Sequence, residues 1–179
     1  MAVERLLLVV DMLNDFMHPN GVLYCGDEAR KIVQPTIELV KWFRFHGYPI
    51  VYIQDAHAPD DKEFERFPPH AVKGTWGSAV IDELKPEPND PVVPKTRFSA
   101  FYKTNLEEIL SNYDPAEVWV AGVCTSICVM DTVADLKNRD YTVVVPVLCV
   151  ADFDPEMHSF ALKRMEKVYG AKIVTELPK

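Results

Sequence analysis

The segment 118–136 constrains the fold of this chain more than any other. It reads Val-Trp-Val-Ala-Gly-Val-Cys-Thr-Ser-Ile-Cys-Val-Met-Asp-Thr-Val-Ala-Asp-Leu, which is an apolar run, a turn at Gly122, and then apolar side chains at helical spacing. A short continuous apolar run is typical of a strand covered on both faces, as in a parallel sheet. The segment therefore predicts a strand, a tight turn and a helix, with Cys128 in the first turn of that helix.

Apolar runs and helical repeats alternate along the rest of the chain. We expect strands at residues 6–11, 48–54, 91–94, 117–123, 142–146 and 171–174, and helices at residues 29–46, 78–84, 105–110, 127–139 and 155–169. Strands separated by helices form a parallel sheet with right-handed crossovers and helices on both faces. The prediction is one three-layer α/β/α domain over residues 1–179, Rossmann-like, with a mainly parallel sheet of about six strands.

Composition and charge exclude several classes of partner. The chain of 179 residues is 48% hydrophobic and carries a net charge of −8, with Lys and Arg scattered singly. A nucleic acid or an anionic membrane would require a basic patch. The longest apolar runs, at residues 6–10 and 142–150, are too short to span a bilayer. Four cysteines without disulfide-like spacing and an N-terminus without a signal-peptide pattern predict a cytoplasmic protein.

Polar side chains follow the predicted strands where each strand ends. Asp11 ends the first strand, Asp55 follows the second with His57 two residues later, Lys95 follows the third, and Cys128 follows the fourth. In open α/β sheets, ligands bind beyond the carboxyl ends of the strands. The sequence therefore predicts that these side chains converge at one edge of the sheet.

Three of these residues form a coherent catalytic set. A helix N-terminus favours the thiolate form of Cys128, and its backbone N–H groups can hold an oxyanion. Asp11 can take the thiol proton and return it to a leaving amine, while Lys95 favours both anionic forms. Each residue alone has an ordinary structural explanation, and only their joint placement indicates a nucleophilic site.

Asp55, His57 and His70 form a second candidate cluster. One carboxylate and two neutral imidazoles suit Zn²⁺, Mn²⁺ or Fe²⁺ and leave positions open for water or substrate. The spacing to His70 matches no standard metal motif, so two polar histidines on an exposed loop explain the sequence equally well.

Three motifs resemble those of the isochorismatase-like cysteine hydrolases, which include nicotinamidases, N-carbamoylsarcosine amidases and isochorismatases. The motifs are Val-Val-Asp-Met-Leu-Asn-Asp-Phe at 9–16, Lys-Thr-Arg-Phe-Ser-Ala-Phe at 95–101, and Gly-Val-Cys-Thr-Ser-Ile-Cys-Val-Met-Asp-Thr at 122–132. The resemblance implies an Asp11–Lys95–Cys128 triad and a thioester intermediate. It also implies a cis peptide between Val123 and Cys124, with the N–H groups of Cys124 and Cys128 as the oxyanion hole. Cys124 is then structural, and Cys25 and Cys149 are expected to be packing residues.

Within this superfamily, the motif around His57 and His70 resembles the metal segment of nicotinamidases. That resemblance implies a divalent metal ion, with Zn²⁺ as the leading candidate, bound by Asp55, His57 and His70. It also implies that Phe16 and Phe67 sandwich a flat heteroaromatic amide, and that nicotinamide is hydrolysed to nicotinate and ammonia. The family further implies a homo-oligomer.

Some residues depart from the nicotinamidase pattern. Leu13 stands where Gln is usual, Phe67 replaces a common Trp, Ser126 replaces a frequent Asp, and the loop after Lys95 is short. The first alternative is therefore an amidase for a ureido compound such as N-carbamoylsarcosine, with Arg97 as the group for a substrate carboxylate. Remoter alternatives are an isochorismatase-type hydrolase, which needs no nucleophilic thiol, and a non-catalytic binding module.

Overall fold

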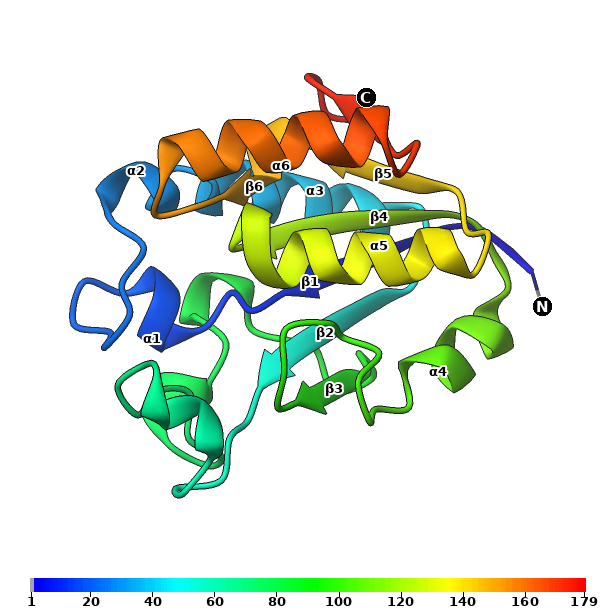
Figure 1. The fold of residues 1–179 in the computed structure, drawn as a ribbon. Coiled ribbons are helices and arrows are strands. Elements are labelled where there is room, and N and C mark those ends of the chain that lie inside the picture. The colour runs from blue at the N-terminus through cyan, green and yellow to red at the C-terminus, as the bar shows by residue number, and fades with distance from the viewer. Residues whose placement is uncertain (1) are drawn as a thin grey trace.

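The computed structural model describes residues 2–179 and is built around a sheet of seven strands (Figure 1). The strands are β1 Val3–Val10, β2 Ile50–Asp55, β3 Val92–Lys95, β4 Pro115–Val123, β5 Val143–Pro146, β6 Val150–Ala151 and β7 Lys172–Val174. Their order is β3–β2–β1–β4–β5–β7, β6 also pairs with β4, and every pairing is parallel. The predicted parallel sheet is confirmed. The additional strand, β6, has two residues and is too short to show a periodic pattern.

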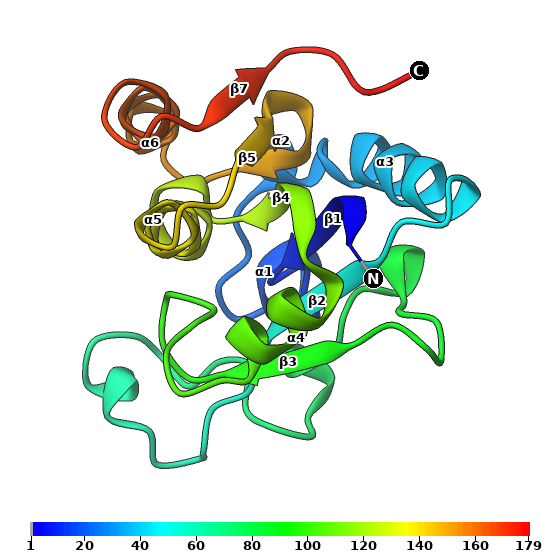
Figure 2. The same cartoon turned by 90° about the vertical axis from the view of Figure 1, so that its right-hand side faces the viewer.

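Helices cover both faces of the sheet, which gives three layers (Figure 2). They are α1 Asn14–Met17, α2 Asp27–Arg30, α3 Val33–Phe45, α4 Leu106–Tyr113, α5 Met130–Asn138 and α6 Pro155–Lys167. Successive side chains of β1 point to opposite faces. Leu7 therefore packs in the core that contains Phe43 of α3, and Leu8 packs in the core that contains Val133 of α5 and Met165 of α6.

The predicted helix at residues 29–46 is divided into α2 and α3. Pro35 has no N–H to donate to the carbonyl of Lys31, and its ring would clash there, so one helix cannot continue through this point. Pro35 is tolerated because it lies in the first turn of α3. The short helix predicted at 78–84 is replaced by two 3₁₀ turns, Trp76–Ser78 and Asp82–Leu84.

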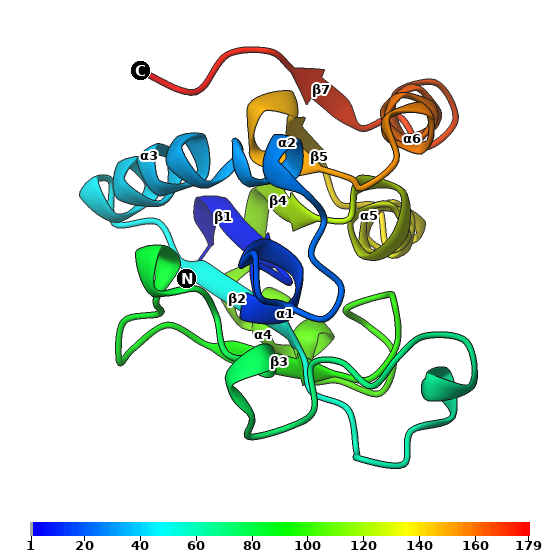
Figure 3. The same ribbon diagram turned by 90° about the vertical axis from the view of Figure 1, so that its left-hand side faces the viewer.

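The carboxyl ends of the central strands open toward α1 and α2, which lie in front of this edge (Figure 3). The side chain of Asp15 in α1 holds two loops there. Its Oδ1 accepts a hydrogen bond from the N–H of Val22 at 3.2 Å, and its Oδ2 accepts one from the N–H of Ala71 at 2.8 Å. Asp15 thereby fixes the segment containing His70 beside the neighbouring Phe16.

No helix of residues 2–179 is both long enough and apolar enough to cross a membrane.

Gly122 allows β4 to lie close to β1. Its φ is +123°, and an added Cβ would lie 1.9 Å from the carbonyl oxygen of Val10. Gly122→Ala should therefore lower the free energy of unfolding by about 3 kcal/mol, measured by urea denaturation. Gly170→Ala is the matched control, because Gly170 also has a positive φ but has open space around it, and we expect a loss of about 1 kcal/mol. Equal losses would contradict the close-approach explanation.

Candidate active site

The residues that follow the first four strands converge as predicted. In the sheet, Lys95, the last residue of β3, lies opposite Asp55, the last residue of β2, in the strand register. The Lys95 ammonium forms ion pairs with Asp55 and with Asp11, the latter at 2.8 Å, and donates a hydrogen bond to Cys128 Sγ at 3.4 Å. Asp11 Oδ1 also accepts the backbone N–H of Asp55 at 2.9 Å. All four side chains are buried.

Burial and pairing set the protonation of this cluster. Burial alone would lower the pKa of Lys95, but the carboxylates of Asp11 and Asp55 outweigh it and raise that pKa well above its usual value. Burial, together with the charge of Asp55, raises the pKa of Asp11 to about 6, against the opposing effect of Lys95. Asp11 is thus ionised at neutral pH but is a much stronger base than a solvated carboxylate.

Cys128 differs from the expectation of a resting thiolate. Burial raises the pKa of its thiol well above the usual range, and the nearby Lys95 ammonium only partly opposes this. The thiol is therefore the resting form, and attack by Cys128 needs a base that removes the proton at that moment. Asp11 is the candidate for this base, because it contacts the same Lys95 ammonium that donates to the sulfur.

The turn that carries Cys128 is held from two sides. The peptide between Val123 and Cys124 is cis, as the resemblance implied, and residues Thr125–Val129 form a π-helical turn before α5. Asp152 Oδ2 accepts a hydrogen bond from the N–H of Ser126 at 2.8 Å, and Nδ1 of His158 in α6 lies 2.8 Å from Thr125 Oγ1. The oxyanion hole at the N–H groups of Cys124 and Cys128 remains a prediction.

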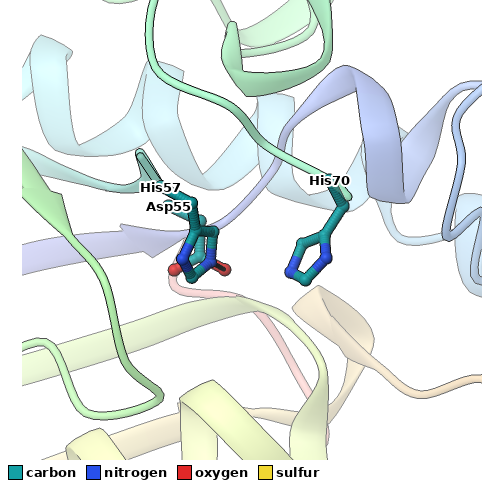
Figure 4. A group of neighbouring side chains, drawn as sticks. All are labelled: Asp55, His57 and His70. Atoms are coloured by element: carbon teal, nitrogen blue, oxygen red, sulfur yellow. Dashed lines mark ion pairs between the residues drawn. The ribbon is translucent and has the colours of Figure 1, made fainter. Parts of the chain in front are cut away.

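Asp55, His57 and His70 also meet, with one potential ligand atom from each within 4.8 Å of the others (Figure 4). His57 Nδ1 lies 3.0 Å from Asp61 Oδ2, and His70 Nδ1 lies 2.8 Å from the carbonyl oxygen of Pro68. Both partners only accept hydrogen bonds, so each Nδ1 carries a proton, and Nε2 is the nitrogen left to bind a metal ion once the imidazole is neutral. This is the tautomer that a metal ligand requires.

The surroundings of His57 also fit a cation. Among the described residues, its buried Nε2 has no hydrogen-bond partner, and it lies 3.6 Å from Asp55 Oδ2. Burial would lower the pKa of His57, but the carboxylates of Asp55 and Asp61 outweigh it and raise that pKa to about 9, so without a metal ion the imidazole is protonated at neutral pH. The carboxylates thus favour a positive charge beside His57 Nε2. A divalent ion carries two positive charges there, whereas a proton carries one. The residues fit Zn²⁺, Mn²⁺ or Fe²⁺.

A second close group, formed by Asp11, Asp55 and Cys128, does not fit a metal ion. Its potential ligand atoms also lie within 4.8 Å of one another. However, the Lys95 ammonium contacts all three side chains and already provides the positive charge. A divalent ion there would have to displace a buried, paired ammonium, which is strongly unfavourable.

Sequence reasoning missed two acidic residues beside the predicted metal ligands. Glu63 is buried, with Oε1 3.8 Å from His70 Nε2 and with Oε2 lacking a hydrogen-bond partner within the described part of the chain. Asp61 binds His57 and also pairs with Arg97 at 3.0 Å. Burial would raise the pKa of Asp61, but the N–H of Glu63, His57 and Arg97 together lower it to about 2. In the sequence, neither acid differs from its exposed charged neighbours.

A cavity of about 400 Å³ connects the two clusters. Cys128, Asp55 and His70 line it, and its walls are mainly apolar. The aromatic lining residues are Phe16, Tyr24, Phe67, Phe98 and Phe153. The structure thus places the predicted clamp residues Phe16 and Phe67 at the cavity. Among the described residues, no Lys or Arg lines it.

The Asp61 contact generates a test of the metal site. Asp61→Asn removes the charge that orients His57 but keeps an oxygen for the N–H of Glu63. We expect zinc affinity to fall by about tenfold or more, measured by competition with a chromophoric chelator. The exposed neighbour provides the control, because Asp60→Asn should leave affinity unchanged. Equal affinity in both variants would contradict a role for Asp61 in metal binding.

Comparison with known proteins assigns the family. The isochorismatase domain matches residues 5–176. A nicotinamidase/pyrazinamidase, PncA from Bacillus subtilis, is 36% identical with a TM-score of 0.91, covering 96% of this chain and 100% of its own. An N-carbamoylsarcosine amidase from Thermoplasma acidophilum is 38% identical with a TM-score of 0.88, covering 99% and 100%. A pyrazinamidase of Pyrococcus horikoshii in complex with zinc is 31% identical with a TM-score of 0.88, covering 97% and 99%. Because this domain spans nearly the whole chain and the similar structures share its fold, this chain belongs to the isochorismatase family of hydrolases.

Proposed function

We propose that this protein is a cysteine-dependent amidase whose substrate is nicotinamide, which it hydrolyses to nicotinate and ammonia. One observation carries the proposal: a single apolar cavity is lined by Cys128 and by two members of the Asp55–His57–His70 cluster, Asp55 and His70. A flat heteroaromatic amide has a ring for the apolar walls, a ring nitrogen for a metal ion and a carboxamide for the sulfur. The similarity to nicotinamidases supports the same assignment.

In this mechanism, the thiol of Cys128 passes its proton to Asp11 as the sulfur attacks the carboxamide carbon. The backbone N–H groups of Cys124 and Cys128 stabilise the oxyanion, and Asp11 then protonates the departing ammonia. Water, deprotonated by the same carboxylate, hydrolyses the thioester and releases the acid. Lys95 keeps Asp11 and the sulfur at fixed positions throughout.

The metal cluster supplies orientation. A divalent ion bound by Asp55, His57 and His70 would act as a Lewis acid for the ring nitrogen of the substrate. The chain's own contribution is to set both imidazole tautomers through Asp61 and the carbonyl of Pro68. Phe16 and Phe67 line the cavity and exclude water from the ring faces.

The cavity favours a neutral amide over the ureido alternative. N-carbamoylsarcosine carries a carboxylate and has no aromatic ring, whereas the cavity walls are mainly apolar and, among the described residues, no Lys or Arg lines them to bind a carboxylate. Arg97, the candidate for that role, instead pairs with Asp61 through Nη1 at 3.0 and 3.1 Å. Asp55 and Glu63, which do line the cavity, would repel a carboxylate. The similarity to an N-carbamoylsarcosine amidase keeps the ureido compound as the second candidate.

Ammonia release tests the substrate directly. We expect zinc-replete protein to release ammonia from nicotinamide, and Cys128→Ala to abolish release. N-carbamoylsarcosine should give much slower release, because it has no ring for the apolar walls and, among the described residues, no Lys or Arg lines the cavity to bind its carboxylate. Turnover of N-carbamoylsarcosine but not nicotinamide would overturn the substrate assignment and retain the nucleophile. Ammonia release by Cys128→Ala would overturn the mechanism.

Asp11→Asn tests the base. The introduced amide can still accept the N–H of Asp55 through its oxygen, but it cannot take the thiol proton. We expect kcat for nicotinamide to fall by about 10²–10⁴-fold, with KM nearly unchanged, because proton transfer is lost while the cavity that binds the substrate ring is unaltered. A thermal melt would confirm that the variant is folded. A fall in kcat of only a few-fold in a folded variant would contradict the role of Asp11.

Three further expectations remain part of this proposal. They are a single catalytic domain over residues 1–179, a cytoplasmic location, and a homo-oligomeric state. The charge distribution and the similarity to small-molecule amidases support a small amide as partner, rather than nucleic acid or a membrane.

A further inference from the structure

Two cysteines outside the triad meet at the wall of the cavity. Cys25 Sγ lies 3.5 Å from Cys124 Sγ, although 99 residues separate them in the chain. Both are free thiols, and both line the same cavity as Cys128. The sequence predicted packing and structural roles for this pair, because spacing along the chain gave no sign of their proximity.

The geometry points to a redox-controlled site: we propose that Cys25 and Cys124 form a reversible disulfide that switches off turnover. A disulfide bond is about 2.0 Å long, so the sulfurs need to approach by only about 1.5 Å. Both sulfurs face a cavity that admits small molecules, so a small oxidant can reach them. Cys149 offers a contrast, because it is fully buried elsewhere in the core.

A small-molecule disulfide is a sufficient oxidant. Cys25, after losing its proton to solvent, attacks one sulfur of the small disulfide and releases a thiolate. Cys124 then attacks the Cys25 sulfur of the mixed disulfide, and its proton goes to the second departing thiolate. Two protein thiols are oxidised and one small disulfide is reduced to two thiols. Cys25 attacks first because its hydrogen bond, with burial, raises the pKa of the Cys124 thiol well above the usual range.

The crosslink would join two walls of the site. Cys25 ends the loop that contributes Val22, Leu23 and Tyr24 to the cavity, and Cys124 begins the turn that carries Cys128. Movement of Cys124 toward Cys25 displaces the N–H assigned to the oxyanion hole. A displacement near 1 Å at a catalytic group lowers the rate strongly. This loss of turnover rests on the proposed amidase function, whereas formation of the crosslink does not.

Formation of the crosslink is tested in Cys128→Ala, which removes the nucleophile and leaves three cysteines. After incubation with 2-hydroxyethyl disulfide, which is small and uncharged, we expect two of the three thiols to disappear without a mercaptoethanol adduct. Peptide mapping should show Cys25 joined to Cys124, and Tm should rise because the crosslink closes a long loop. The same crosslink should form in Cys149→Ala and be absent in Cys25→Ser. A persistent mercaptoethanol adduct, or three unreacted thiols, would overturn the proposal.

The effect on activity is tested with the four-cysteine protein, each sample being compared with its own reduced state. Oxidation should lower kcat for nicotinamide by about tenfold or more, and dithiothreitol should restore it. Cys25→Ser should keep its reduced-state activity after the same treatment. Equal inhibition of Cys25→Ser would assign the effect to Cys128 and overturn the switch, as would a crosslinked protein with unchanged turnover. If reduced protein fails to hydrolyse nicotinamide, the proposed function fails, while the thiol count still decides whether the crosslink exists.

Discussion

The buried ammonium of Lys95 is the interaction on which the rest of this site depends. A charge removed from water is tolerated only when it is paired, and Lys95 is paired twice, with Asp11 and Asp55. One carboxylate belongs to the proposed nucleophilic machinery and the other to the metal cluster. The ammonium therefore sets the distance between the proposed base and a candidate metal ligand. Their relative position follows from three adjacent strands in fixed register.

The position of the proposed catalytic residues was predictable from the sequence, because each of them is encoded locally. Asp11 and Lys95 each lie at the end of an apolar run, and Cys128 follows a glycine turn. Once the alternation of strands and helices implies a parallel sheet, the ends of those runs must lie together. The same reasoning predicted the position of Asp55. Local pattern and global topology agree at these positions, so inference from sequence succeeds there.

Other features depend on the path of loops or on the interior as a whole, and the sequence did not reveal them. Glu63 and Asp61 reach the metal cluster through a loop with no regular period, and Cys25 meets Cys124 for the same reason. The resting state of Cys128 is another case. Its position at the start of a helix is a local property that favours thiolate, whereas its burial is a property of the folded molecule and dominates.

The contact between Arg97 and Asp61 also bears on how substrate preference diverges within one scaffold. The guanidinium lies 3.9 Å from Glu63, a residue of the cavity wall, yet its charge is neutralised by Asp61. The ion pair with Asp61 therefore keeps a guanidinium beside the cavity wall from offering its charge to a substrate carboxylate. A change of substrate class can thus arise at a peripheral loop, while the strand ends that perform the chemistry stay the same. Divergence by this route leaves the reaction unchanged and alters only the substrate whose carbonyl carbon reaches the sulfur.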